Sequence, residues 1–112
     1  MQKEFFEQVE VINYIEKNYP ELLYCASAGG MRTSIGTGAK MKRMGYKKGF
    51  PDLFIYEPCG GFFGLAIELK CDKGTVQPHQ TAWLGKLTMR GYKAVVCYGH
   101  EEAINTIKDY LK

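Results

Sequence analysis

The stretch from Gly49 to Lys70 reads GFPDLFIYEPCGGFFGLAIELK, and its pattern predicts two strands joined by a tight turn near Gly60. With the turn in that place, Asp52 at the start of the first strand lies opposite Glu68 near the end of the second. Directly opposed side chains are roughly 5 Å apart, so two carboxylates placed in this way repel each other. A divalent cation bound between them would remove this repulsion.

The second strand of this hairpin also carries a lysine on the same face as the glutamate. Lys70 follows Glu68 by two positions, whereas Ile67 and Leu69 alternate with them and point toward a core. Mg²⁺ prefers oxygen ligands, so Asp52 and Glu68 are candidate ligands, and the main-chain carbonyl of Leu69 is a third. Metal ions acidify water, and a lysine stabilises charge on phosphate oxygens. The set predicts a metal-assisted phosphodiester hydrolase; an ordinary surface Glu–Lys pair is the alternative.

Length and composition are those of one globular domain spanning residues 1–112. Apolar residues make up 46% of the chain and charged residues 24%, and the net charge is +3. No apolar run reaches the length of a membrane span, and the N-terminus, MQKEFFEQ, lacks the pattern of a signal peptide. We therefore expect an intracellular protein that is not secreted and has no membrane partner. The cysteines, which form no CxxC pair and are expected to be reduced thiols rather than zinc ligands, are Cys25, Cys59, Cys71 and Cys97.

The remaining periodicity predicts an α/β sandwich, with a mixed sheet and flanking helices. The expected order is a helix over about 3–18, a strand over 22–26, a glycine-rich loop over 27–38, a basic segment over 39–48, the hairpin, a helix from 78 to 91, a strand over 92–98 and a C-terminal helix. In the first helix, the apolar residues at helical spacing are Phe5, Phe6, Val9, Ile12, Ile15 and Tyr19. Trp83 and Leu87 are expected in the core.

Two segments ahead of the hairpin are candidates for substrate contact. The loop SAGGMRTSIGTG lacks the spacing of a Walker motif, so we expect a substrate-facing loop that carries Arg32. The basic segment AKMKRMGYKK places five cations within nine residues, namely Lys40, Lys42, Arg43, Lys47 and Lys48. Contact with DNA phosphates and a solubilising patch are both compatible with this composition, and the proximity to Asp52 favours DNA contact.

The spacing of these motifs resembles that of a known nuclease superfamily. Pro51-Asp52, followed after residues 53–67 by Glu68-Leu69-Lys70, resembles the PD-(D/E)XK signature. The segments GFPDLFIY, IELK and GYKAVVCYG, with Gly74 and Gln80 between the last two, resemble the VRR-NUC family, including its small stand-alone phage-type members. The resemblance covers roughly residues 45–99. It implies a PD-(D/E)XK restriction-endonuclease-like core, with a mixed central β-sheet flanked by helices.

The resemblance also implies roles for single residues. Asp52 and Glu68 match the metal-binding acids, with Mg²⁺ as the expected cofactor and Mn²⁺ as a substitute. Lys70 matches the catalytic lysine, and Gln80 matches a glutamine placed beside the active site.

Two further correspondences involve the N-terminal part of the chain. The family tends to carry an acid on its first helix; here Glu4 is the first choice as a further metal ligand, with Glu7 or Glu10 as alternatives. The segment Ser27–Arg32 resembles a family segment that usually has an asparagine before the glycines, and this chain lacks that asparagine.

The stand-alone family members resemble structure-specific DNA nucleases. The resemblance therefore implies cleavage of branched DNA, with four-way (Holliday) junctions as the favoured substrate, in the host cytoplasm if the chain is phage-encoded. Symmetric cutting of a junction needs two sites related by a two-fold axis, so a homodimer is expected. Its candidate faces are the apolar first helix and Phe62-Phe63. The alternatives are a flap or other structure-specific nuclease, a non-catalytic nucleic-acid-binding module, and a restriction-type nuclease.

Overall fold

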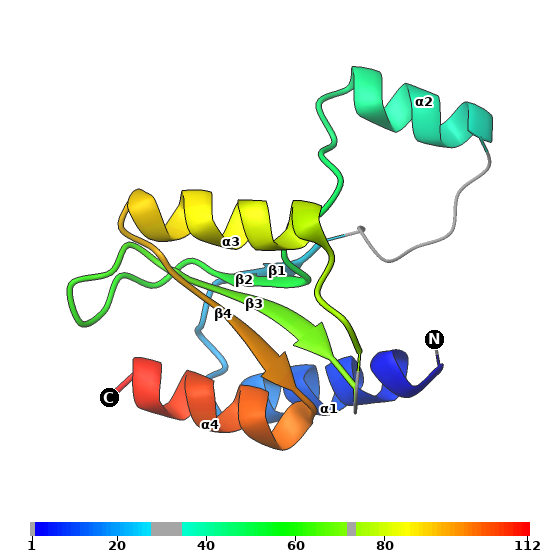
Figure 1. Ribbon diagram of the computed structural model, residues 1–112. Coiled ribbons are helices and arrows are strands. Elements are labelled where there is room, and N and C mark those ends of the chain that lie inside the picture. The colour runs from blue at the N-terminus through cyan, green and yellow to red at the C-terminus, as the bar shows by residue number, and fades with distance from the viewer. Residues whose placement is uncertain (1, 28–34, 72–73) are drawn as a thin grey trace.

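The computed structural model describes residues 2–27, 35–71 and 74–112, which form a four-stranded sheet between helices (Figure 1). In chain order the elements are α1 (Gln2–Asn18), β1 (Tyr24–Ala26), α2 (Ile35–Arg43), β2 (Leu53–Ile55), β3 (Leu65–Lys70), α3 (Pro78–Met89), β4 (Lys93–Tyr98) and α4 (His100–Tyr110). None of the described helices is long and apolar enough to cross a membrane. The architecture is therefore the mixed α/β sandwich that the periodicity predicts.

The sheet has the order β1-β2-β3-β4 and contains both strand orientations. β1–β2 and β2–β3 are antiparallel, whereas β3 and β4 run parallel and are connected through α3. The predicted tight turn is present, since Cys59 and Phe62 exchange two main-chain hydrogen bonds of 3.1 and 3.0 Å. Gly60 and Gly61 between them have φ angles of 60° and 88°, the left-handed conformation that a two-residue hairpin turn favours.

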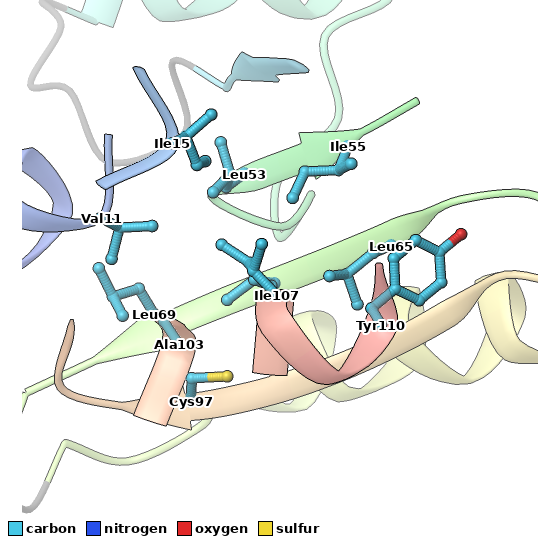
Figure 2. Packing of buried hydrophobic residues seen from close by; sticks show 11 residues of the cluster. Val11, Ile15, Leu53, Ile55, Leu65, Leu69, Cys97, Ala103, Ile107 and Tyr110 are labelled. Atoms are coloured by element: carbon cyan, nitrogen blue, oxygen red, sulfur yellow. The ribbon is translucent and has the colours of Figure 1, made fainter. Parts of the chain in front are cut away.

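One face of the sheet packs against α1 and α4 and forms the main core (Figure 2). Alternate residues of β2 and β3 point into it, and α1 and α4 supply apolar side chains from the other side. The buried members of this cluster are Val11, Ile15, Leu53, Ile55, Leu65, Ile67, Leu69, Cys97, Ala103, Ile107 and Tyr110. Burying each large aliphatic side chain stabilises the fold by about 1.5–3 kcal/mol. Ile67 and Leu69 thus occupy the core, as the sequence predicts.

The opposite face of the sheet is covered by α3 (Figure 1). A smaller cluster forms there from Phe54, Ala66 and Leu87, with Trp83 packed against it, so the prediction that Trp83 and Leu87 belong to the core is confirmed. Because Glu68 is two residues from Ala66 along β3, strand alternation places it on this face as well. The polar residues of β3 therefore lie on the α3 side of the sheet.

Three details differ from the sequence-based expectation. The first strand begins at Tyr24 rather than at residue 22, and α2 begins at Ile35, inside the segment expected to be a loop. In α1, Phe5 and Phe6 are 63% and 59% exposed, whereas Val11 is buried. The residues of this helix that enter the core with α4 and β3 are Val11 and Ile15, and the aromatic residues of its first turns lie outside the core. All four cysteines are free, as expected for reduced thiols.

Candidate active site

Asp52 and Glu68, termed the acid pair below, lie across from each other at the open end of the β2–β3 hairpin. Leu53 pairs with Ile67, and one further step in this antiparallel register places Asp52 opposite Glu68. The predicted opposition is therefore confirmed. The main-chain N–H of Leu69 donates a 2.7 Å hydrogen bond to Oδ2 of Asp52, which fixes the carboxylate against β3.

Lys70 completes a row of charged side chains on the central strand. β3 lies between β2 and β4, and all six of its residues are buried, including Glu68 at 2% exposure and Lys70 at 8%. The ammonium Nζ of Lys70 lies 3.6 Å from Oε2 of Glu68, so the two form an ion pair. Burying a charge is unfavourable unless it is paired, and the lysine therefore offsets one of the two negative charges.

Gln80 reaches the acid pair from the first turn of α3. Its Oε1 accepts a 2.9 Å hydrogen bond from the main-chain N–H of Gln77, the residue that precedes the helix. Because the carbonyl oxygen is used in this way, the amide nitrogen Nε2 points to Glu68 and donates a 3.0 Å hydrogen bond to Oε2. The helix start and the orientation of the glutamate thus depend on the same side chain.

The surroundings of Glu68 disfavour its ionised form. Burial is the largest cause, and the negative charge of Asp52 adds to it; together they raise the pKa of Glu68 to about 8, although the nearby Lys70 acts in the opposite direction. Burial also raises the pKa of Asp52, whereas the N–H of Leu69 lowers it. In the described part of the chain, Oε1 of Glu68 is buried without a hydrogen-bond partner. Two ionised carboxylates have no hydrogen to share, so this pair requires a proton or a cation.

A hard divalent cation suits this set of donors. Mg²⁺ is commonly held by one or two carboxylates, and the buried, unpartnered Oε1 of Glu68 is an oxygen of the required type. The described residues contain no group of three acidic, histidine or cysteine side chains that could hold a metal. The protein would therefore supply the acid pair, and the carbonyl of Leu69 stays a prediction as a third ligand.

The acids of α1 do not join the acid pair in this structure. Glu4 and Glu10 are exposed on the helix surface. Glu7 instead accepts hydrogen bonds from the main-chain N–H and Nδ1 of His100, at the start of α4. The ligand role of Glu4 therefore stays a prediction. A small cavity beside Asp52 and Leu69 is lined from α1 by Val11 and by the polar residue Gln8, one helical turn after Glu4.

The predicted DNA-binding residues gather around α2, which stands apart from the sheet layers (Figure 1). Lys40, Lys42 and Arg43 lie in the last turn of α2 and are exposed, and the exposed Lys47 and Lys48 follow in the segment leading to β2. Arg32 lies outside the described residues. The helix thus presents cations without a neighbouring acid in its own sequence.

Sequence reasoning missed one polar group beside the acid pair. The hydroxyl of Tyr46, between α2 and β2, is buried and has no hydrogen-bond partner among the described residues. Burial, followed by the negative charge of Asp52, raises the pKa of Tyr46. A single tyrosine within a basic segment gives no sign of such a position, because the sequence does not show how the segment folds back over the site.

Known proteins resemble this chain over nearly its whole length. The family described as "VRR-NUC domain" matches residues 3–101. A solved structure described as "VRR_NUC domain protein" has a TM-score of 0.85 and 31% sequence identity, and the match covers 97% of this chain and 88% of that chain. No curated protein sequence matches. Because the family match extends over most of the residues, this chain belongs to the VRR-NUC domain family and is a nuclease-type domain.

Proposed function

We propose that this protein is a Mg²⁺-dependent DNA endonuclease with a PD-(D/E)XK-type site, and that it hydrolyses phosphodiester bonds in branched DNA. The observation that carries the proposal is the convergence of Asp52, Glu68 and Lys70 at the open end of one hairpin, with Gln80 bonded to Glu68. Charged side chains are seldom buried unless they are paired or functional, and here Glu68 is buried beside the half-buried Asp52.

The acid pair would hold the cation, with the carbonyl of Leu69 as a further oxygen; Mn²⁺ is expected to substitute for Mg²⁺. When bound, the cation supplies Lewis-acid polarisation of the phosphate and makes water more acidic. Asp52 is already oriented by the N–H of Leu69, and Glu68 by Gln80, so both carboxylates are held in place before substrate arrives. Such preorganisation reduces the entropy lost on binding.

Lys70 is the residue best placed to stabilise the transition state. Hydrolysis joins a water oxygen to phosphorus and breaks one phosphate ester bond, while negative charge grows on the phosphate oxygens. An ammonium group fixed in a site of low solvent exposure stabilises this charge more strongly than it would in water. Lys70 meets both conditions, because its side chain is buried and is held by the ion pair with Glu68.

The basic residues around α2 would guide DNA to the acid pair. Lysine and arginine side chains release counterions when they contact phosphates, which favours binding of any DNA backbone. The segment that connects α2 to Asp52 carries further lysines, so the positive charge continues from the helix to the site. The function of this region is therefore backbone contact rather than base reading.

A homodimer accounts for symmetric cutting of a four-way junction, since a single chain has one acid pair and cuts one strand. The candidate interface is the exposed aromatic start of α1, where Phe5 and Phe6 contact each other edge to face. Phe62 and Phe63 are less free for this role, because they also contact Lys93 and Tyr92 of the same chain. Replacing Phe5 and Phe6 by glutamate should give monomers by size-exclusion chromatography with light scattering, and single nicks in place of paired cuts.

The proposal is tested by a cleavage panel of single-stranded, duplex, flap and four-way DNA, with and without Mg²⁺. The unaltered protein should cut the four-way junction only with the metal. Asp52→Ala and Lys70→Ala should abolish cutting while the folded variants still bind DNA. Lys86→Ala, on the exposed surface of α3, is a matched control for charge removal and should cut normally.

Other outcomes would decide against the proposal in different ways. Normal cutting by both site variants would show that the acid pair and the lysine are not the catalytic groups. Binding that is unaffected by EDTA, without cleavage by Mg²⁺ or Mn²⁺, would identify a non-catalytic DNA-binding module. Preferred cutting of flaps would keep the chemistry and correct the substrate.

A further inference from the structure

The hydroxyl of Tyr46 is one of two buried side-chain polar atoms that lack a hydrogen-bond partner in the described part of the chain; the other is Oε1 of Glu68. The negative charge of Asp52 raises the pKa of both side chains. Buried polar groups almost always find a partner, so each exception needs an explanation. For Glu68 the explanation is the cation that the acid pair would hold. The hydroxyl of Tyr46 also carries a donor, and a cation alone would leave that donor without a partner.

Local backbone structure fixes the position of Tyr46, whose hydroxyl is affected by the charge of Asp52. Its N–H donates a 2.9 Å hydrogen bond to the carbonyl of Met41, which ties it to the end of α2. Gly45 before it has a φ angle of 101° and turns the chain out of the helix. After it, Gly49 lies so close to α3 that an added Cβ atom would come within 2.7 Å of the His79 side chain. The segment is therefore anchored on both sides of Tyr46.

A purely structural role does not explain the hydroxyl. Phenylalanine would fill the same space and would leave no polar atom unpartnered, so the tyrosine lowers the stability of the free protein relative to that residue. Asp52 accepts no hydrogen bond from this hydroxyl; its Oδ2 accepts one from the main-chain N–H of Leu69 instead. Because burial and the charge of Asp52 raise the pKa of Tyr46, the hydroxyl keeps its proton and remains a donor at neutral pH.

We propose that the hydroxyl of Tyr46 donates a hydrogen bond to a non-bridging oxygen of the scissile phosphate, which makes Tyr46 a catalytic residue of this nuclease. The inference rests on the proposed function. Phosphate oxygens are acceptors only, and they are the groups that the substrate brings next to the acid pair. Tyr46 also lies three residues after the end of the basic helix along which the DNA backbone would approach. Tyr46 would contact the phosphate from the segment between α2 and β2, whereas Lys70 extends from β3.

The test compares Tyr46→Phe with the unaltered protein on the DNA that the latter cuts. The single-turnover rate constant at saturating DNA should fall about tenfold to a hundredfold, the usual effect of losing one hydrogen bond to a charged group. The dissociation constant for DNA should change less than about threefold, because most of the affinity comes from the many backbone contacts. The melting temperature should stay the same or rise. Tyr56→Phe, an exposed tyrosine of the hairpin, is the matched control and should cut at the normal rate.

A second measurement addresses the contact itself. Sulfur in place of the contacted non-bridging oxygen should slow the unaltered protein more than it slows Tyr46→Phe, since the variant has already lost the hydrogen bond. Equal sulfur effects in the two proteins, or an unchanged rate constant in Tyr46→Phe, would overturn the inference and leave the proposed function standing. Failure of the unaltered protein to cut any DNA in the panel would overturn the proposed function, and the inference with it.

Discussion

Replacing Glu68 by glutamine tests whether the site holds a destabilising charge in the absence of metal. The folded protein raises the pKa of Glu68 from 4.5 to about 8, by burial first and by the charge of Asp52 second. Between these two pH values the unfolded chain has lost the proton, whereas the folded protein still keeps it. The folded state therefore binds more protons, and its stability is present below pH 4.5 and is lost as the pH rises through 8.

The size of the effect follows from this shift. One pKa unit corresponds to 1.36 kcal/mol, so the free energy of unfolding should fall by roughly 3–4 kcal/mol between pH 5 and pH 8. Glutamine cannot ionise, and its side-chain oxygen can still accept the hydrogen bond from Gln80. Glu68→Gln should therefore have nearly the stability of the unaltered protein at pH 5, and should exceed it by roughly 3–4 kcal/mol at pH 8.

The assay is urea unfolding in EDTA at pH 5, 6, 7 and 8, followed by circular dichroism. Glu57→Gln removes an exposed acid from the loop after β2 and is the matched control; it should keep the pH dependence of the unaltered protein. A Glu68→Gln variant with the same pH dependence as the unaltered protein would refute the reasoning. So would a free energy of unfolding that does not fall between pH 5 and pH 8.

Three further predictions follow from the same geometry. Adding Mg²⁺ at pH 8 should raise the melting temperature of the unaltered protein, since ligand at a hundred times its dissociation constant stabilises by about 2.7 kcal/mol, and alanine at either member of the acid pair should remove this effect in calorimetry. Gly45→Ala should lower the free energy of unfolding by about 1–3 kcal/mol, the cost of its positive φ alone, because an added Cβ there meets open space. Gly49→Ala should lower it further, because Gly49 also has a positive φ and its contact with α3 leaves no room for Cβ. Replacing Lys40 and Lys42 together by glutamate should weaken the binding of all DNA forms, measured by filter binding. The slope of log K against log salt concentration should become shallower by about 2, whereas Lys108→Glu on α4 should change neither quantity.

Much of the fold could be predicted from local patterns. Strand alternation around Glu68 assigned Ile67 and Leu69 to the core, and the two glycines after Cys59 placed the turn that sets the register. The buried face of the first helix could not be predicted in this way, because its apolar residues lie around more than half of the helix. Which of them are buried depends on α4 and β3, which are distant in sequence, so Val11 is in the core while Phe5 is not.

The candidate site likewise contains residues that the sequence predicts and one that it does not. Asp52, Glu68 and Lys70 are close in the hairpin, so spacing alone brings them together, and Gln80 is reached through the first turn of α3. Tyr46 is brought to the site by the fold of a segment without regular structure, and residue types there carry no periodicity to interpret.

The charges of the site suggest why metal and DNA would bind together. The acid pair contributes two negative charges and Lys70 one positive charge, so the ionised site has a net charge of minus one. A phosphodiester adds one more negative charge, and a single divalent cation then neutralises the total. Below pH 8 the cation must first displace the proton of Glu68, which weakens its binding, whereas an arriving phosphate strengthens it. Because such coupling is reciprocal, DNA should raise the affinity for Mg²⁺ by the same factor by which Mg²⁺ raises the affinity for DNA.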